Sequence, residues 1–271
     1  MRFFLAVFAI PLLSQVPQNP SPMVEYTRAH ERLREQTPPG ERHQLALGTL
    51  YLPPRLKRAT VPLYMHFHGE PWIAEMAGSR LRGAAVISVN LGQGSGVYAK
   101  PFLDPAFFGT LLAEAEEKAG AGFRPITLSS WSAGYGAVRA ILRQPSYYQR
   151  IDRYMAIDSV HAGYKGSEII PENLDVFLQF ARDAAAGGKA MLLTHSEVFP
   201  GTYASTTEVA DFILKSLNLP RKAVLKWGPM GMQQLSEAKT GNLAILGFAG
   251  NSAPDHLDHL HALPEFVRLL K

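Results

Sequence analysis

The chain has 271 residues and a net charge of +4, with 46% hydrophobic, 18% charged and 10% aromatic residues. These fractions are typical of a globular protein and exclude a disordered or fibrous one. The basic residues are spread thinly and form no run of five like charges, so the sequence gives little support to nucleic-acid binding. The absence of cysteine excludes a disulfide scaffold, a Cys-ligated metal, a thiol nucleophile and a diacylglycerol anchor.

The N-terminus has the features of a secretory signal peptide. Arg2 precedes an apolar run over residues 3–13, and a polar, Pro-rich stretch follows. The run is too short to span a bilayer, which needs roughly 20 residues. We therefore predict a signal peptide and leader over residues 1–22, a secreted or periplasmic protein, and no stable membrane anchor after signal removal. The alternative is a buried N-terminal segment.

Downstream, strand-like apolar runs alternate with helical patterns. The expected strands are residues 45–52, 62–67, 84–90, 126–130, 154–157, 190–194 and 243–248, and the expected helices are 25–36, 105–118, 133–142, 174–185 and 206–217. Only a polar loop separates the first two strands, so we expect them to be antiparallel neighbours. The later alternation predicts βα crossovers and an α/β fold, with a mostly parallel sheet and helices on both faces. The long segment 222–241 is either a hairpin or lid over a pocket, or packing.

The most informative stretch surrounds Ser132. An apolar strand leads into Ser130-Trp131-Ser132-Ala133-Gly134, and a helical pattern follows. In a nucleophile elbow a serine occupies a tight strand-to-helix turn, and small residues two before and two after it let strand and helix approach closely. The following backbone N–H and the helix N-terminus favour negative charge on an attacked carbonyl oxygen. The alternative is a Ser/Gly-rich turn without chemistry.

On these residues the chain resembles the α/β-hydrolase family, over most of its length after His43. The resemblance implies the α/β-hydrolase fold in a single domain over residues 23–271, a catalytic triad with a serine nucleophile, and no cofactor. One departure is Ser130, which occupies the position of the motif's first glycine.

A second motif, His66-Phe67-His68-Gly69-Glu70, ends the strand predicted at 62–67 and resembles the family's oxyanion loop. The implied oxyanion hole consists of the N–H of Ala133 with that of Gly69 or Glu70. His66 and His68 share one face of a strand, which also suits a metal, but we favour core packing for one and loop ordering for the other. We expect the substrate pocket to include His68, Trp131 and Tyr98.

Three histidines follow the last expected strand, where the family has its catalytic base. In a helix that starts near Asp255 and turns 100° per residue, His256 at 0° shares the buried face with Leu260 at about 40°, Leu263 at about 340°, Val267 at about 20° and Leu270 at about 320°. By the same rotation His259 lies at the edge of that face and His261 points outward. His256 is therefore the predicted base, and His259 and His261 are assigned to surface or edge packing.

The acid of the triad has competing candidates. Asp158 directly follows an apolar strand, whereas Glu197 follows the next one, which is the family's more frequent position. Glu197 lies three residues beyond its apolar run, so we predict Asp158, with Glu197 as the alternative and Asp255 as a further one. His161 and His195 also follow strand ends, so a rim of histidines is a weaker candidate for a zinc site, without an established zinc motif.

These residues together predict a secreted esterase: a serine hydrolase that cleaves a carboxylic ester of a small molecule, lipid or carbohydrate through an acyl-enzyme intermediate. Ser132 is the expected nucleophile, His256 the base and Asp158 the acid. No metal is assigned to the site. Two alternatives remain, a non-catalytic ligand-binding protein on a hydrolase scaffold and a metal-dependent hydrolase that uses the rim histidines.

Overall fold

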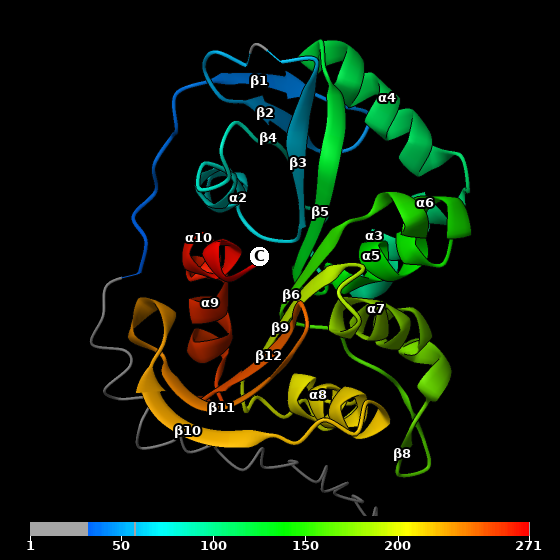
Figure 1. The fold of residues 1–271 in the computed structure, drawn as a ribbon, viewed down its shortest axis with the longest axis vertical. Coiled ribbons are helices and arrows are strands. Elements are labelled where there is room, and N and C mark those ends of the chain that lie inside the picture. The colour runs from blue at the N-terminus through cyan, green and yellow to red at the C-terminus, as the bar shows by residue number, and fades with distance from the viewer. Residues whose placement is uncertain (1–31, 57, 271) are drawn as a thin grey trace, which may run out of the picture.

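The computed structural model describes residues 32–56 and 58–270. The predicted signal peptide and most of the helix expected at 25–36 lie outside the described residues, and residues 32–36 form no helix. A twisted sheet of ten strands runs through the molecule in the order β1-β2-β4-β3-β5-β6-β9-β12-β11-β10 (Figure 1).

The strands of this sheet are β1 (Glu41–Gln44), β2 (Thr49–Leu52), β3 (Thr60–Phe67), β4 (Ala85–Val89), β5 (Gly122–Ser132), β6 (Arg153–Ser159), β9 (Ala190–His195), β10 (Lys222–Trp227), β11 (Gln233–Thr240) and β12 (Leu243–Phe248). The six central strands, from β4 to β12, are parallel, and antiparallel pairs extend the sheet at both edges. A separate ribbon contains β7 (Tyr164–Lys165) and β8 (Glu168–Ile169). The predicted mostly parallel sheet is confirmed.

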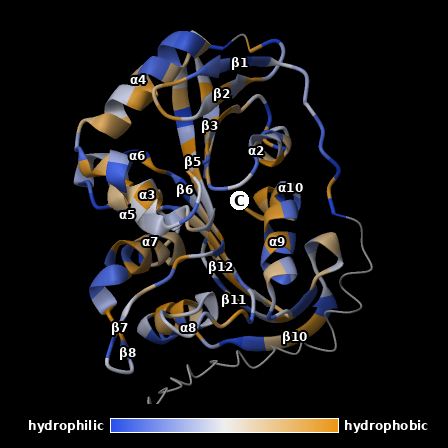
Figure 2. Ribbon diagram, turned by 180° about the vertical axis from the view of Figure 1, so that it is seen from behind, coloured by the Kyte–Doolittle hydropathy of each residue, from blue (hydrophilic) through white to orange (hydrophobic). Residues whose placement is uncertain are grey.

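Helices cover both faces of the sheet, as predicted (Figure 1). One face carries α2 (Pro71–Gly78), α9 (Ala253–His261) and α10 (Leu263–Phe266), and the other carries α3 (Ser95–Ala99), α4 (Phe107–Ala119), α5 (Tyr135–Leu142), α6 (Pro145–Arg150), α7 (Asp175–Ala185) and α8 (Thr206–Ser216). Figure 2 shows hydrophobic and hydrophilic segments alternating along α4 and α7, as expected of helices with one buried face. Within the described residues no helix is long and apolar enough to cross a membrane.

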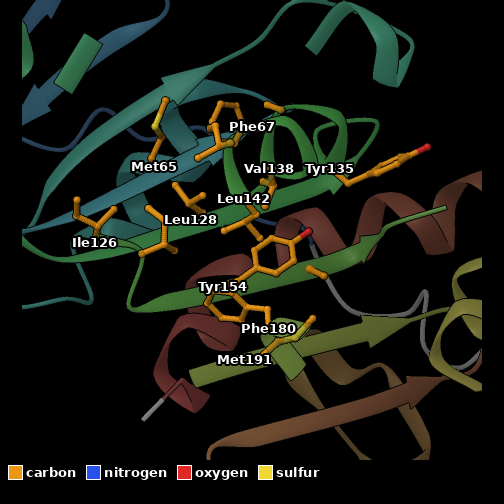
Figure 3. Close-up of a cluster of buried hydrophobic side chains, with 14 of the residues drawn as sticks. Met65, Phe67, Ile126, Leu128, Tyr135, Val138, Leu142, Tyr154, Phe180 and Met191 are labelled. Carbon is orange, nitrogen blue, oxygen red and sulfur yellow. The ribbon is translucent and has the colours of Figure 1, made fainter. Parts of the chain in front are cut away.

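The core forms two apolar layers, one on each face of the sheet. The central strands are buried on both faces, so they consist of nearly continuous apolar runs rather than an alternating pattern. Figure 3 shows the larger layer, where Leu128 and Tyr154 of the sheet pack with Val138 of α5 and Phe180 of α7. This packing fixes α5, and therefore the turn that precedes it, against the centre of the sheet.

The first two strands are not the neighbours that the sequence predicted. β2 begins only at Thr49, because Leu45 and Gly48 close a tight turn from β1 with a hydrogen bond of 3.1 Å. β2 then pairs with β4, and both edges of β3 are taken by the parallel strands β4 and β5. The loop between β2 and β3 therefore crosses β4 instead of closing a hairpin.

Segment 222–241 forms the antiparallel hairpin β10–β11, which extends the sheet beyond β12. No residue of β10 is buried, and most of β1 is exposed. Edge strands of this kind lack a continuous apolar run, which is why the sequence predicted neither β1 nor β10 as a strand.

Candidate active site

Ser132 lies at the carboxyl end of β5, three residues before the start of α5. Its backbone has φ 47°, a left-handed conformation that residues other than glycine adopt at a cost in free energy and that recurs at functional sites. The turn fits closely under β3, because a Cβ on Gly134 would overlap the carbonyl oxygen of Phe67. The strand, sharp turn and helix of the predicted elbow are all present.

Ser130, the departure from the motif, is buried beneath this turn in a chain of hydroxyl groups. Its Oγ lies 2.8 Å from Tyr154 Oη and 2.9 Å from Ser159 Oγ, and Ser159 Oγ donates to the carbonyl oxygen of Ser132 over 2.8 Å. Because the single proton of Ser159 is used there, Ser130 must donate to Ser159 and Tyr154 to Ser130. The extra hydroxyl of Ser130 therefore supports the backbone of the elbow from below.

His256 and Asp158 are joined by a hydrogen bond of 2.6 Å between Nδ1 and Oδ2. Asp158 is 1% exposed and also accepts hydrogen bonds from Ser196 N–H at 2.8 Å, Ser196 Oγ at 2.7 Å and Thr206 Oγ1 at 2.6 Å. Burial alone would raise the pKa of Asp158, but nearby His259 and the hydrogen bonds from His256 and Thr206 hold it well below its usual value. The carboxylate is therefore ionised and can only accept, so Nδ1 of His256 carries a proton, and Nε2 makes no hydrogen bond with any of the described residues.

Trp131 connects this pair to the elbow. Its ring stacks on His256 with centroids 4.6 Å apart, and its Nε1–H donates to the His256 carbonyl oxygen over 2.9 Å. Trp131 directly precedes Ser132, and Ser132 is the strand partner of Ser159, the residue after Asp158. The three predicted triad residues thus come from the ends of two neighbouring strands and from the first turn of α9.

The helix carrying His256 differs from the one that the sequence predicted. α9 ends at His261 and a new helix begins at Leu263, so positions beyond this break do not share one helical face. His256 is partly exposed, with 24% of its side chain accessible, whereas His259 is buried. His259 is therefore a core residue rather than a surface or edge residue, with Nδ1 3.0 Å from Thr194 Oγ1. His261 does not point away from the protein but contacts Trp72 edge-on.

The two alternative acids serve other parts of the fold. Glu197 is exposed, and its Oε2 accepts the Gly250 N–H over 3.1 Å. Asp255 is the third residue of α9 and forms a capping box with Ser252. Both carboxylates bind the loop between β12 and α9, directly before the helical turn that carries His256.

Ser132 opens into a cavity of about 650 Å³. Its wall includes Ala133, His68 and Trp131. The rings of His68 and Trp131 stack with their centroids 4.9 Å apart. A second hollow, of about 710 Å³, lies between the β10–β11 hairpin and the C-terminal residues and shares no lining residue with the first. Residues 222–241 therefore form a hairpin at the sheet edge but do not cover the cavity at Ser132.

Tyr98 lies behind the cavity wall rather than in it. The side chain is fully buried, and its Oη is 2.7 Å from Nδ1 of His68 while donating to Oδ1 of Asn90 over 3.1 Å. Because that proton goes to Asn90, Nδ1 of His68 donates to Tyr98. Burial lowers the pKa of His68. Tyr98 therefore orients His68 and has no place in the pocket wall.

The predicted oxyanion groups lie on the two turns beside Ser132. Gly69 has φ 120° and packs against Leu260, and Glu70 is the N-cap of α2. Within residues 32–56 and 58–270, the backbone N–H groups of Ala133, Gly69 and Glu70 donate to no acceptor. Ala133 lines the same cavity as Ser132, whereas Gly69 and Glu70 do not, and N–H groups that face a nucleophile are what an oxyanion hole requires.

Of the other histidines, His161 and His195 both lie near Asp158, whose charge opposes the lowering of their pKa by burial. His66 is buried with Nδ1 3.0 Å from Ser129 Oγ, and His195 is buried against Arg221. Only His161 joins His68 in the cavity wall, with its Nδ1–H donating to the Ala204 carbonyl oxygen over 2.9 Å. No group of three or more His, Asp or Glu side chains suited to a metal ion occurs in the part of the chain that the structure describes.

Several site residues carry no local sequence signal. Ser196 in the loop after β9 and Thr206 at the start of α8 bind Asp158, and Arg139, Asn173 and Tyr203 line the cavity from three further segments. Their positions follow from the packing of α5 and of the loops after β6 and β9, which no motif in the chain encodes.

Comparison with known proteins identifies the fold. No protein-family model and no curated protein matches the sequence. Among solved structures, the ester hydrolase EH1AB1 from the metagenome of Lake Arreo superposes with a TM-score of 0.50 at 10% identity, over 91% of this chain and 86% of that one. Esterase 2 of Thermogutta terrifontis superposes with a TM-score of 0.47 at 12% identity, over 87% of this chain and 97% of that one. The chain has the α/β-hydrolase fold.

The α/β-hydrolase fold hosts many reactions, so fold similarity at this identity does not specify the chemistry. It does explain the placement of the site. In an open α/β sheet, ligands bind at the carboxyl ends of the parallel strands, where the turns after β3, β5 and β6 meet. The chemistry of the site therefore depends on the residues at those strand ends.

Proposed function

We propose that the protein is a serine hydrolase that cleaves a carboxylic ester. The observation that carries the proposal is the 2.6 Å hydrogen bond from His256 Nδ1 to the buried Asp158, at the sheet edge that holds Ser132 on an elbow. It leaves Nε2 of a neutral imidazole as a base for a serine that faces a cavity. The esterase structures that share the fold are consistent with this chemistry.

In the proposed reaction, Ser132 Oγ forms a bond to the acyl carbon while its proton passes to His256 Nε2. The N–H of Ala133, with that of Gly69 or Glu70, stabilises the negative charge on the former carbonyl oxygen. Collapse of this intermediate breaks the bond to the alcohol, which leaves with the proton from His256. Water then attacks the acyl-enzyme by the same steps and restores Ser132. Throughout, ionised Asp158 orients His256 and stabilises its charged form.

The decisive experiment is the intact mass of the protein after incubation with a fluorophosphonate probe. Wild type should gain one adduct, Ser132→Ala none, and His256→Ala should react at least about 100-fold more slowly, because a general base contributes about that much. Circular dichroism of each variant controls for folding. A folded wild-type protein that gains no adduct would contradict the proposal.

We further propose that residues 1–22 direct export of the enzyme, on the basis of the basic start and short apolar run. Expression of the full chain in a bacterium, followed by N-terminal mass spectrometry of the periplasmic fraction, tests this. Recovery of a mature chain lacking the apolar run supports export, and an uncleaved chain in the cytoplasm contradicts it.

A further inference from the structure

Arg139 lies in the wall of the cavity that Ser132 faces. It follows Tyr135 by one turn of α5, and its guanidinium carbon lies 5.3 Å from the centroid of the Tyr135 ring, within the roughly 6 Å of a cation–π contact. The side chain is half-buried. Helix α5 begins directly after the elbow, so a group in this position is held at a fixed offset from the nucleophile.

The charge of Arg139 is not neutralised within the described residues. The side chain of Arg139 makes no ion pair or hydrogen bond with the described residues, and no Asp or Glu lines the cavity. Arg143, one turn further along α5, provides the contrast: it donates to the Glu172 carbonyl oxygen and pairs with Asp175 at 3.3 Å. A half-buried guanidinium without a carboxylate, inside a cavity, is suited to an anion that enters with a ligand.

Asn173 adds neutral donors to the same cavity. Its Oδ1 accepts the Gly163 N–H over 2.8 Å, which orients the amide and leaves both N–H bonds of Nδ2 without an acceptor among the described residues. The hydrogen bond from Arg143 to Glu172, the neighbour of Asn173, brings this loop alongside α5. Arg139 and Asn173 thus add a charged donor and neutral donors to one cavity.

We propose that Arg139, assisted by Asn173, binds a carboxylate of the substrate, so that the enzyme prefers esters that carry an anionic group on the acyl or the alcohol side. This inference rests on the proposed ester hydrolysis and names the substrate class. A planar guanidinium can bind a carboxylate through two parallel hydrogen bonds, which would also orient the scissile bond toward Ser132.

The test compares matched esters that differ only in charge. One arm uses the mono-p-nitrophenyl ester of succinate against p-nitrophenyl butanoate, and the other uses 4-acetoxybenzoate against 4-acetoxybenzamide, so the arms separate acyl-side from alcohol-side carboxylates. In at least one arm wild type should favour the anionic ester in kcat/KM, and Arg139→Gln should reduce that ratio about 10-fold or more. Arg150→Gln is the control, because Arg150 pairs with Glu116 at 3.7 Å and does not line the cavity, and it should leave the ratio within about twofold.

A binding measurement separates this inference from the proposed function. Monomethyl glutarate is titrated by NMR into the inert Ser132→Ala protein and into Ser132→Ala/Arg139→Gln, and the second protein should bind about 10-fold more weakly. Equal binding to both proteins, or ratios unaffected by Arg139→Gln in both ester arms, would overturn the inference while leaving hydrolysis of neutral esters intact. Failure of the fluorophosphonate reaction would instead contradict the serine hydrolase itself.

Discussion

At the scale of single residues, the pairing of Asp158 with His256 makes the acid testable. Asp158→Asn keeps the shape but replaces an ionised acceptor with an amide that can donate to Nδ1, which favours the wrong imidazole tautomer. We expect kcat to fall about 10³- to 10⁴-fold with little change in KM, by analogy with other serine–histidine–aspartate triads. Steady-state kinetics on a p-nitrophenyl ester measures it.

Glu197→Gln is the matched control, because Glu197 is the other acid that the sequence offered and the structure uses it to bind the Gly250 N–H. Its kcat should stay within about threefold of wild type. If Glu197→Gln lost activity and Asp158→Asn kept it, the assignment of the acid would be wrong.

The hydroxyl chain beneath the elbow gives a second prediction at this scale. Ser130→Ala leaves the buried Tyr154 hydroxyl without its acceptor, so we expect a loss of about 1–2 kcal/mol in the free energy of unfolding. Tyr154→Phe alone should cost a similar amount, and the double variant clearly less than the sum, since no buried donor is then stranded. Urea unfolding of all four proteins gives this cycle. Strict additivity of the two losses would count against the proposed chain of hydrogen bonds.

At the scale of elements, the elbow depends on how closely α5 approaches β3. Gly134 has φ −59°, a conformation open to alanine, so Gly134→Ala tests the close contact with the Phe67 carbonyl oxygen alone. Since a backbone oxygen cannot move aside like a side chain, we expect a loss of about 3 kcal/mol or more in the free energy of unfolding, or an insoluble protein.

Gly96→Ala in α3 is the matched control, because the described residues leave the space around its Cβ open to 4 Å. Alanine also has the better helix propensity, so the variant should be neutral or more stable by about 0.5–1 kcal/mol. Thermal unfolding followed by circular dichroism measures both variants. Similar effects of the two would show that packing under β3 is not what requires Gly134.

At the scale of the whole molecule, buried histidines couple stability to pH. Burial lowers the pKa of His66 to about 3, and burial together with Arg221 lowers that of His195 to about 4. Below pH ~6.5 the unfolded chain takes up protons that the folded chain does not, so stability falls as the pH falls toward these values. Each histidine lowers the free energy of unfolding by up to about 1.4 kcal/mol for every unit by which the pH falls. Above about pH 7.5 these two histidines should no longer make the free energy of unfolding depend on pH.

His66→Gln tests this coupling through the slope of unfolding free energy against pH. That slope can be compared even if the substitution itself changes the stability of the protein. Wild type should lose free energy of unfolding as the pH falls from 6.5 to 5, and His66→Gln should lose about 1.5 kcal/mol less over the same range. Urea titrations across this range measure the difference. An unchanged slope would mean that His66 is protonated in the folded protein.

The sequence by itself determined the fold class and the identity of the proposed triad. The parallel strands are buried on both faces, so their apolar runs can be recognised without the structure. The elbow motif is also recognisable from the sequence, because Ser132 and Gly134 lie two positions apart, although the Phe67 carbonyl oxygen that Gly134 makes room for belongs to β3. His256 was also predicted, although α9 ends at His261 and part of the helical face used to select His256 lies beyond that residue.

Only the tertiary structure decided what depends on contacts between distant segments. The pairing of β2 with β4 rather than β3 reflects competition for strand edges, on which proximity in sequence has no bearing. Asp158 is distinguished from Glu197 by which carboxylate reaches Nδ1 across 98 positions of the chain. The contacts of Ser196 and Thr206 with Asp158, the burial of Tyr98 and the unpaired charge of Arg139 follow in the same way from loops that meet only after the sheet has formed.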